Sequence, residues 1–442
     1  MCLSMYEFYL SDLEKLINYE KENYVLVENK FSRHRKMAFK DFVYYILLNK
    51  GKSSVLEIDE YFKERFGGDV IPISKQDLSQ QRLLLNPLIF KDADKNALKE
   101  IYSGNQWELE KFKGYHVFNV DGSQLDIPNT PITREEFEVK LRALKETKSP
   151  KARVSVMSDA KNEFIIDSII SPSHIGENNL AFQNIENASK IIDLEKAIVV
   201  FDRAYASTEL FLQLIEKNSK FIFRLKKSDY KKERKHMITN DESVEIKLNS
   251  LRTQNIKNKE LKEKAEKITH LNLRILNIPL ETGEIETLIT NLPPETANPL
   301  ELKELYGERW QIETGYDILK NKLHIENFSG KKRITIEQDF YAQIHMYNIL
   351  ISAKIEFNKK IQTENKNCQC QYKININILA GKLKNNLLEI IFTENPKKRK
   401  KLWKNIDKTI KRNLRKVKKK PPTPRKTKKP KRKYPYNNRK NF

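Results

Sequence analysis

The chain has 442 residues, of which 39% are hydrophobic and 32% are charged, and its formal net charge is +24. The charge is concentrated at one end, because residues 396–442 hold 23 Lys and Arg residues and one acid, whereas the first 395 residues carry a net charge of only +2. Such a length suffices for two or three domains, and only three cysteines exclude a disulfide framework. We therefore expect a nearly neutral globular body followed by a basic tail.

The location of the protein follows from what its sequence lacks. No apolar run reaches the roughly 18 residues that a membrane span requires, and the opening MCLSMYEFYLSDLEKL has acidic residues where a secretory signal needs positive charge. A Gly-rich phosphate-binding motif is also absent, so an ATP-driven mechanism is not expected. These features predict a cytoplasmic protein without membrane association.

Residues 1–105 are predicted to form a small all-helical domain. KMAFKDFVYYILLNK places apolar residues at helical spacing, and PISKQDLSQQRLLLNP offers Ser74 as an N-cap with Asp77 three residues later. On the second helix Gln76, Gln80 and Arg82 are of the residue types that read base edges in DNA. The alternative is a solvated polar helix face.

After Gly114 the hydrophobic period changes to that of strands. The predicted order is three strands, a helix, a strand, a helix and a strand, which is typical of a layered α/β domain. Its strands are YHVFNVDG, RVSVMSD (153–159), FIIDSII (164–170), AIVVFD (197–202) and FIFRLK (221–226), and its helices are NLAFQNIENASKII and ASTELFLQLIEK. The second and third strands are expected to pair as a hairpin, and Ser207 or Thr208 to cap the second helix.

The segment after this core predicts further strands and then two helices. VEIKL, LNLRILNIPL and IETLITNL alternate as strands and suggest a β-rich insertion over residues 227–300. The helices are YGERWQIETGYDILK (306–320) and TIEQDFYAQIHMYNILISAKI (335–355), and both should belong to the core. Residues 301–395 would thus complete the domain begun by residues 106–226.

Four functional side chains of residues 306–320 would share one helix face. Tyr306, Arg309, Glu313 and Lys320 fall within an arc of about 60° over about 21 Å of a continuous α-helix. The apolar residues form a second stripe, and Trp310 lies on that apolar side, so we expect it in the core. The alternative for the polar stripe is a solvated helix face.

Two acids stand at predicted strand ends, Asp121 after VFNV and Asp202 after IVVF. Carboxylates at such positions are ligands for hard divalent cations, and Glu313 from an adjacent helix would complete a site for two metal ions. Taken singly, each acid could instead serve as a cap or turn residue, and Asp121 precedes Gly122 in a possible turn.

With these motifs the chain resembles the insertion-sequence transposases of the DDE class, in the bacterial and archaeal subgroup with a Tyr-(2)-Arg-(3)-Glu-(6)-Lys signature. The matching residues are Asp121 in VDGS, Asp202 in FDRAY, TNLP at 290–293, the signature Tyr306, Arg309, Glu313 and Lys320, and QDFYAQIHMYNIL from Gln338. The resemblance implies an RNase H-like catalytic core with a β-rich insertion.

The resemblance also implies an activity. It would be cut-and-paste transposition that depends on Mg²⁺, with Mn²⁺ as a substitute, and that passes through a DNA hairpin. Asp121, Asp202 and Glu313 would bind the metal, and Tyr306, Arg309 and Lys320 would hold DNA phosphates. The partners would be double-stranded DNA, as terminal inverted repeats and target, and a second copy of the chain in a homodimer, within the nucleoid. Some relatives stack a flipped base on a Trp of the insertion, but this chain has no Trp between Arg203 and Tyr306.

Two alternative functions remain open, and the two ends of the chain have predicted roles of their own. The chain could be another nuclease of the RNase H fold, or a non-catalytic DNA-binding descendant of a transposase. The N-terminal domain would bind the element ends, and the basic tail, residues 396–442, would be an extended or disordered arm that binds nucleic acid without reading sequence. Apolar residues at three- and four-residue steps allow a helix on DNA over residues 397–417.

Overall fold

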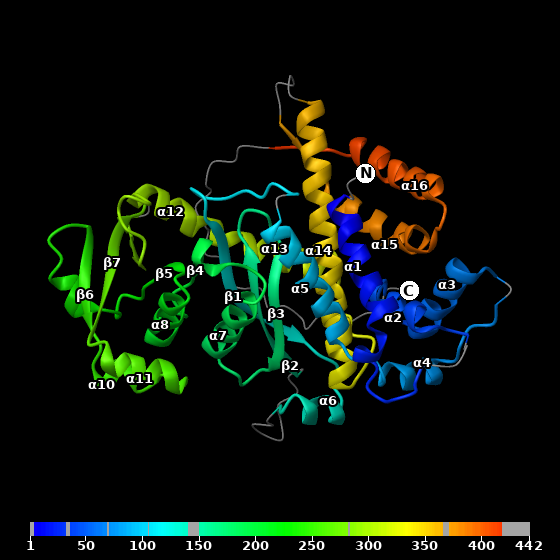
Figure 1. Cartoon of the computed structure of the whole chain (residues 1–442), viewed down its shortest axis with the longest axis horizontal. Coiled ribbons are helices and arrows are strands. Elements are labelled where there is room, and N and C mark those ends of the chain that lie inside the picture. The colour runs from blue at the N-terminus through cyan, green and yellow to red at the C-terminus, as the bar shows by residue number, and fades with distance from the viewer. Residues whose placement is uncertain are drawn as a thin grey trace. The chain divides into compact units, whose positions relative to one another are not determined.

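The computed structural model describes residues 4–31, 36–68, 70–104, 106–139, 150–281, 283–365 and 371–417 (Figure 1). The chain folds into two compact units, each built from separate stretches of sequence. The first unit contains Met1–Ala97, Asp126–Pro150 and Asp317–Phe442, and the second contains Leu98–Leu125 and Lys151–Tyr316. No helix in the described ranges is both long and apolar enough to cross a bilayer.

The second unit is organised around an eight-stranded mixed sheet with the order β3-β2-β1-β4-β5-β8-β7-β6. The strands are β1 (His116–Asp126), β2 (Lys151–Asp159), β3 (Ile165–Pro172), β4 (Ala197–Phe201), β5 (Lys220–Arg224), β6 (Asp241–Lys247), β7 (His270–Pro279) and β8 (Ile285–Thr290). β4 is parallel to both β1 and β5, whereas β2–β3, β5–β8, β8–β7 and β7–β6 are antiparallel pairs. The predicted strands and the β2–β3 hairpin are therefore confirmed.

The central strands have the composition of strands covered on both faces. All five residues of β4 are buried, as is the first half of β1, and both segments are nearly continuous apolar runs. The helices of this unit include α7 (Glu177–Ala188), α8 (Thr208–Glu216), α9 (Lys231–Lys235), α10 (Ser250–Thr253), α11 (Lys259–Lys267) and α12 (Pro299–Gly307). Ser207 caps α8 as predicted, since its hydroxyl accepts a hydrogen bond from Leu210 N.

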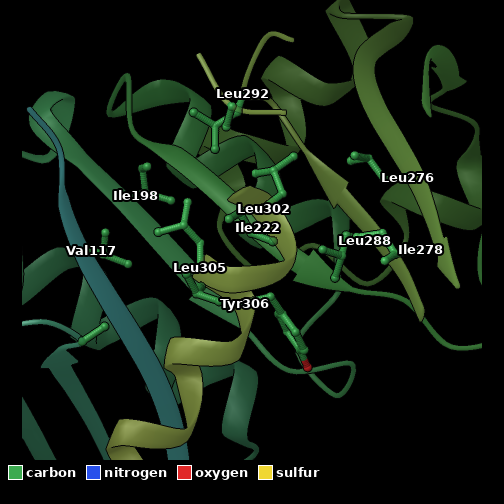
Figure 2. Close-up of a cluster of buried hydrophobic side chains, with 13 residues drawn as sticks. Val117, Ile198, Ile222, Leu276, Ile278, Leu288, Leu292, Leu302, Leu305 and Tyr306 are labelled. Atoms are coloured by element: carbon green, nitrogen blue, oxygen red, sulfur yellow. The ribbon is translucent and has the colours of Figure 1, made fainter. Parts of the chain in front are cut away.

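Helix α12 packs directly on the central sheet. Figure 2 shows one buried cluster in which Leu302, Leu305 and Tyr306 of α12 meet sheet residues such as Val117 and Ile198. Each member of the cluster is at most 6% exposed. The sheet thereby fixes the position of Tyr306, the first residue of the predicted signature.

The strands of the predicted insertion continue the main sheet. β8 pairs with β5, and the TNLP motif holds this junction together. Thr290 Oγ1 donates to Phe221 O at 2.5 Å, and Asn291 accepts from Phe221 N at 2.9 Å and donates to Ser219 O at 2.9 Å. This part of the motif therefore joins β5 to the chain that leads into α12.

The described residues of the first unit are mostly helical, with the short strand pair β9 (Tyr372–Lys373) and β10 (Arg415–Lys416). Its helices are α1 (Met5–Tyr19), α2 (Phe39–Leu47), α3 (Ser54–Phe66), α4 (Lys75–Arg82), most of α5 (Leu88–Ser103), α6 (Pro131–Glu136), α14 (Arg333–Glu364), α15 (Ile376–Phe392) and α16 (Pro396–Lys411). The long helix α14, yellow in Figure 1, packs against α1, α2 and α15. The helical predictions for the N-terminal region and for α14 are confirmed, and Ser74 caps α4.

The beginning of the basic tail differs from the prediction. Residues 396–411 form α16, which packs on α15 and buries Trp403, Ile406 and Ile410. The helix that was allowed over residues 397–417 is present over residues 396–411, and without DNA. The expectation of an extended or disordered arm does not hold for these residues, because their apolar side chains recur every three or four positions and bury one helix face. Residues 418–442, for which no helix was expected, lie outside the described residues.

Candidate active site

The two predicted catalytic aspartates meet at one edge of the parallel part of the sheet. Val120 of β1 is registered with Phe201 of β4, so the residues that follow, Asp121 and Asp202, emerge side by side. Asp121 Oδ1 accepts a hydrogen bond from Gly122 N at 2.9 Å, while β1 itself continues to Asp126. The sequence-based pairing of these acids is therefore reproduced by the strand register.

The signature residues do not lie on one continuous α-helix. A 3₁₀ turn, η3 (Glu308–Trp310), separates α12 from α13 (Gln311–Asn321). The tighter turn changes the angle about the helix axis between Tyr306 and the residues of α13. The prediction that the four side chains form one stripe on a continuous α-helix is therefore wrong. Tyr306 and Arg309 are both buried, with 5% and 7% of their surface exposed, so they do not lie on a solvated helix face.

Two of these side chains, Tyr306 and Arg309, nevertheless lie beside the aspartates. Tyr306 Oη donates to Asp202 Oδ1 at 3.0 Å, and the Arg309 guanidinium lies 5.8 Å from the centre of the Tyr306 ring. Arg309 Nη2 is also 3.9 Å from Glu313 Oε1, and the Glu313 side chain is 44% exposed. Asp202, Tyr306, Arg309 and Glu313 thus form a connected chain of polar contacts.

The electrostatic environment of Asp121 opposes a second negative charge. The pKa of its carboxyl is raised to about 6, chiefly by burial and to a smaller extent by Asp202 and Glu177, while the Gly122 N–H and Arg309 act in the opposite direction. The protein alone therefore stabilises the ionised form of Asp121 poorly. A bound cation would relieve this repulsion.

The donor chemistry fits a hard divalent cation, since carboxylate oxygens are the ligands that Mg²⁺ and Mn²⁺ accept. Within the described ranges no three Asp, Glu, His or Cys side chains are close enough to form a metal site as they stand. The three predicted ligands are supplied by β1, the end of β4 and α13, and Glu313 is partly exposed beside Arg309.

Several residues around Asp121 were not selected from the sequence. Glu177, the first residue of α7, pairs with Arg153 at 2.9 Å, and Tyr316 Oη donates to the Asp121 backbone carbonyl at 3.0 Å. A Cβ on Gly122 would lie 3.2 Å from both Glu177 Cγ and Tyr205 Oη. Sequence signals existed for two of these residues, because Gly122 and Tyr205 belong to the quoted VDGS and FDRAY.

Comparison with known proteins identifies the family. Residues 113–349, more than half of the chain, match the model of the transposase DDE domain. The chain belongs to the DDE transposase family. Its structure is similar to that of a piggyBac transposase synaptic complex with hairpin DNA, with 9% sequence identity, a TM-score of 0.45, and coverage of 95% of this chain and 86% of that one. A search of curated proteins finds no match.

Membership in the DDE transposase family gives the site its general chemistry. The family consists of metal-dependent enzymes that cut and transfer DNA, and divalent metal ions are its usual cofactors. Asp121, Asp202, Tyr306, Arg309 and Glu313 all lie within the matched region of this transposase. The matched region also includes the TNLP junction and the first half of α14.

The other predicted DNA contacts of the transposase are placed in the first unit. Lys320 lies in the last turn of α13 and is partly buried, while Gln76 and Gln80 are exposed on α4. Arg82 is only 4% exposed and pairs with Asp339 at 2.7 Å. It also donates to Gln338, to Ser329 and to the Thr335 carbonyl.

Two sequence-based assignments are corrected by these positions. Arg82 cannot contact base edges as an exposed side chain in this fold, because its guanidinium is buried and bonded to Asp339, Gln338 and the Thr335 carbonyl of α14. Trp310 is 45% exposed and lies 5.6 Å from the Arg309 guanidinium, so its predicted place in the core is wrong. The 3₁₀ turn accounts for the second error, since it rotates Trp310 away from the buried side.

Proposed function

We propose that this chain is an active DNA transposase that cuts an insertion sequence at its terminal inverted repeats and joins it to target DNA. The reaction would be a Mg²⁺-dependent phosphoryl transfer that passes through a hairpin intermediate. The observation that carries the proposal is the placement of Asp121 and Asp202 at the ends of adjacent parallel strands, with Tyr306 hydrogen-bonded to Asp202 and with Arg309 beside Glu313.

The strand order supports an RNase H-like core. β3, β2, β1, β4 and β5 are consecutive in the sheet, with an antiparallel hairpin at one end and three parallel strands after it. β6, β7 and β8 extend this arrangement as the β-rich insertion between the second aspartate and Glu313. On this proposal the two halves of the core are separated in sequence by the insertion.

We assign Asp121, Asp202 and Glu313 as the metal ligands, with Mg²⁺ as the cofactor and Mn²⁺ as a substitute. When bound, the metal would activate the attacking oxygen and stabilise the leaving oxygen. The Tyr306 hydroxyl fixes the orientation of the Asp202 carboxylate through their 3.0 Å hydrogen bond. Arg309 supplies positive charge beside the carboxylates and offers a planar donor group for a DNA phosphate.

DNA binding would involve residues of both units. Lys320 would hold a phosphate near the cleavage site, as would Arg309, whereas the contact of Tyr306 with Asp202 favours positioning as its first role. Gln76 and Gln80, exposed on α4, remain proposed base contacts of a helical end-binding domain. Cutting at two ends requires two active sites, so we expect a homodimer in the synaptic complex.

The test uses a DNA duplex that carries the inverted repeat flanking the coding sequence. Asp121→Asn, Asp202→Asn and Glu313→Gln should each abolish cleavage and leave binding of the end in gel-shift assays, because charge and metal ligation are lost while shape is kept. Glu304→Gln is the matched control, since Glu304 is exposed on α12 near the same site. Near-normal cleavage by any of the three variants would remove that residue from the ligand set.

The products separate this proposal from the alternatives. Hairpin formation at the element end supports a transposase. Metal-dependent hydrolysis without hairpins or strand transfer would identify a nuclease of the same fold. Specific binding of the ends without any cleavage in Mg²⁺ or Mn²⁺ would identify a non-catalytic descendant.

A further inference from the structure

Helix α16 is anchored to the first unit through one apolar face. It begins after Asn395, whose side chain accepts hydrogen bonds from Lys397 N and Lys398 N. Trp403, Ile406 and Ile410 follow at steps of three and four residues and are 6%, 1% and 1% exposed. The Trp403 ring lies 4.1 Å from the ring of Tyr6 in α1, so the helix is fixed on the protein's own core.

The opposite face of α16 is a row of lysines. Five of them fall within an arc of about 100° that extends over about 17 Å of helix axis. We call this set the lysine stripe, and its members are Lys397, Lys400, Lys401, Lys404 and Lys408, all of them exposed. The stripe is centred roughly 140° away from the buried residues.

The cations beside the stripe are already paired, whereas those of the stripe are not. Lys398 lies 3.1 Å from Glu389, and Lys411 lies 2.6 Å from Glu364 and 3.3 Å from Asp407. Arg399 donates to the Thr393 carbonyl. Among residues 371–417 and the other described ranges, no carboxylate lies within ion-pair distance of a stripe lysine. The unneutralised charge is therefore confined to one face.

The buried apolar face decides what kind of partner the stripe fits. A cationic amphipathic helix binds a membrane surface by inserting its apolar side between lipids. In α16 that side is covered by α15 and Tyr6, so only the ammonium groups remain for a partner. Ammonium groups are point charges that suit phosphates without reading base edges. A regular row of phosphates matches the stripe better than a folded acidic protein surface does.

We propose that the lysine stripe is a preformed, sequence-independent binding surface for the phosphate backbone of duplex DNA. The choice of DNA as the polyanion rests on the proposed function. Because the helix is folded before it meets DNA, binding does not have to order its backbone, in contrast to a disordered arm. The stripe would increase affinity for DNA of any sequence and leave recognition of the element ends to other residues.

The experiment compares two double variants of the full chain on one helix. Lys400→Gln/Lys404→Gln removes two stripe charges, and Lys398→Gln/Lys411→Gln removes two paired charges, so the formal charge change is equal. Binding to a fluorescent random-sequence duplex is measured from 50 to 300 mM salt, where each lost phosphate contact flattens the log–log slope by about 0.9. We expect the slope to flatten by about 2 for the stripe variant and by less than about 0.5 for the control. Equal changes in the two variants would overturn the proposal.

Three further measurements make the outcome decisive. Replacement of all five stripe lysines by Gln should flatten the slope by about 4.5, while Trp403 fluorescence and circular dichroism remain unchanged because Gln preserves the helix. On vesicles of phosphatidylcholine and phosphatidylserine the variants should lose only the electrostatic attraction of the missing charges; a loss of vesicle binding with unchanged DNA slopes would refute the assignment. Hairpin formation on element ends is assayed in parallel. If the element ends are cleaved normally but the stripe variants have the salt slope of the wild type, the proposed role of the stripe is wrong and the proposed function stands. If the stripe variants change the salt slope but the wild type does not cleave the ends, the proposed function is wrong and the role of the stripe stands.

Discussion

Replacement of Asp121 by asparagine should stabilise the folded protein at pH 8 when no divalent cation is present. Burial and the adjacent Asp202 and Glu177 raise the pKa of this carboxyl from 3.8 to about 6. A difference of about two pKa units corresponds to about 3 kcal/mol, and partial solvent exposure reduces the expected gain to about 1–2 kcal/mol. Asparagine keeps the oxygen that accepts from Gly122 N and removes only the charge.

The pH dependence has a defined sign. Since the folded-state pKa is raised, this group favours the folded state fully below pH 3.8, and that contribution is lost as the pH rises through about 6. The advantage of Asp121→Asn should therefore be greatest above pH 7 and should shrink toward pH 4. Mg²⁺ should stabilise the wild type and have little effect on the variant, because the cation neutralises the same repulsion.

Thermal denaturation followed by circular dichroism at pH 5 and pH 8 tests this, first with a chelator and then with Mg²⁺. The comparison uses shifts in melting temperature, because a chain of two units need not unfold in one step. Glu304→Gln, which removes an exposed charge, should show no comparable shift. An Asp121→Asn protein that melts at or below the wild-type temperature at pH 8 without metal would refute the electrostatic reasoning.

Three further variants test individual contacts by denaturation. Arg82→Met should cost about 3–5 kcal/mol, because it leaves the buried Asp339 without its partner, and a cost below about 1 kcal/mol would contradict the internal network. Trp403→Ala should cost about 3–5 kcal/mol, whereas Trp310→Ala should cost less than about 1 kcal/mol, and equal costs would contradict their different burial. Tyr306→Phe should cost about 1–2 kcal/mol and slow cleavage without weakening end binding, and unchanged cleavage would exclude a positioning role for the hydroxyl.

Much of the sheet was predictable because its strands are local signals. β4 has the sequence AIVVF, and all five of its residues are buried. The strand ends where this apolar run ends, just before the charged Asp202. The two β-rich runs of the β2–β3 hairpin and the cap at Ser207 were equally visible. The pairing of Asp121 with Asp202 followed from the rule that parallel strands place their carboxyl ends at one edge.

The geometry around the signature was not predictable from spacing. An ideal helix wheel assumes 100° for each residue, and the 3₁₀ turn at Glu308–Trp310 breaks this assumption at the point where Arg309 and Trp310 are placed. Arg82 is a second case, since its partners Ser329 and Asp339 are about 250 residues away in sequence and could be found only in the folded chain. The type of the Arg82 side chain suggested contact with DNA, but contacts with residues distant in sequence determine that it is buried.

The folding of the first part of the basic tail on the protein was also not predictable from the local sequence. Charge density over residues 396–442 favoured an extended or disordered arm, and the three- and four-residue apolar steps over residues 397–417 indicated a helix only on DNA. Those steps were sufficient to form α16 because Tyr6 and α15 provide an apolar surface to pack against. That surface is assembled from segments that a local reading of the tail does not include.

The most direct test of the central claim is a metal titration of cleavage at an element end. The full chain is incubated with a duplex that carries the inverted repeat, and products are resolved on a denaturing gel as Mg²⁺ or Mn²⁺ is added after chelation. We predict a hairpin product that is absent with chelator, increases with either metal, and is missing at all metal concentrations when Asp121, Asp202 or Glu313 is replaced. Cleavage that proceeds equally well in chelator would contradict the assignment of these three carboxylates as the metal site.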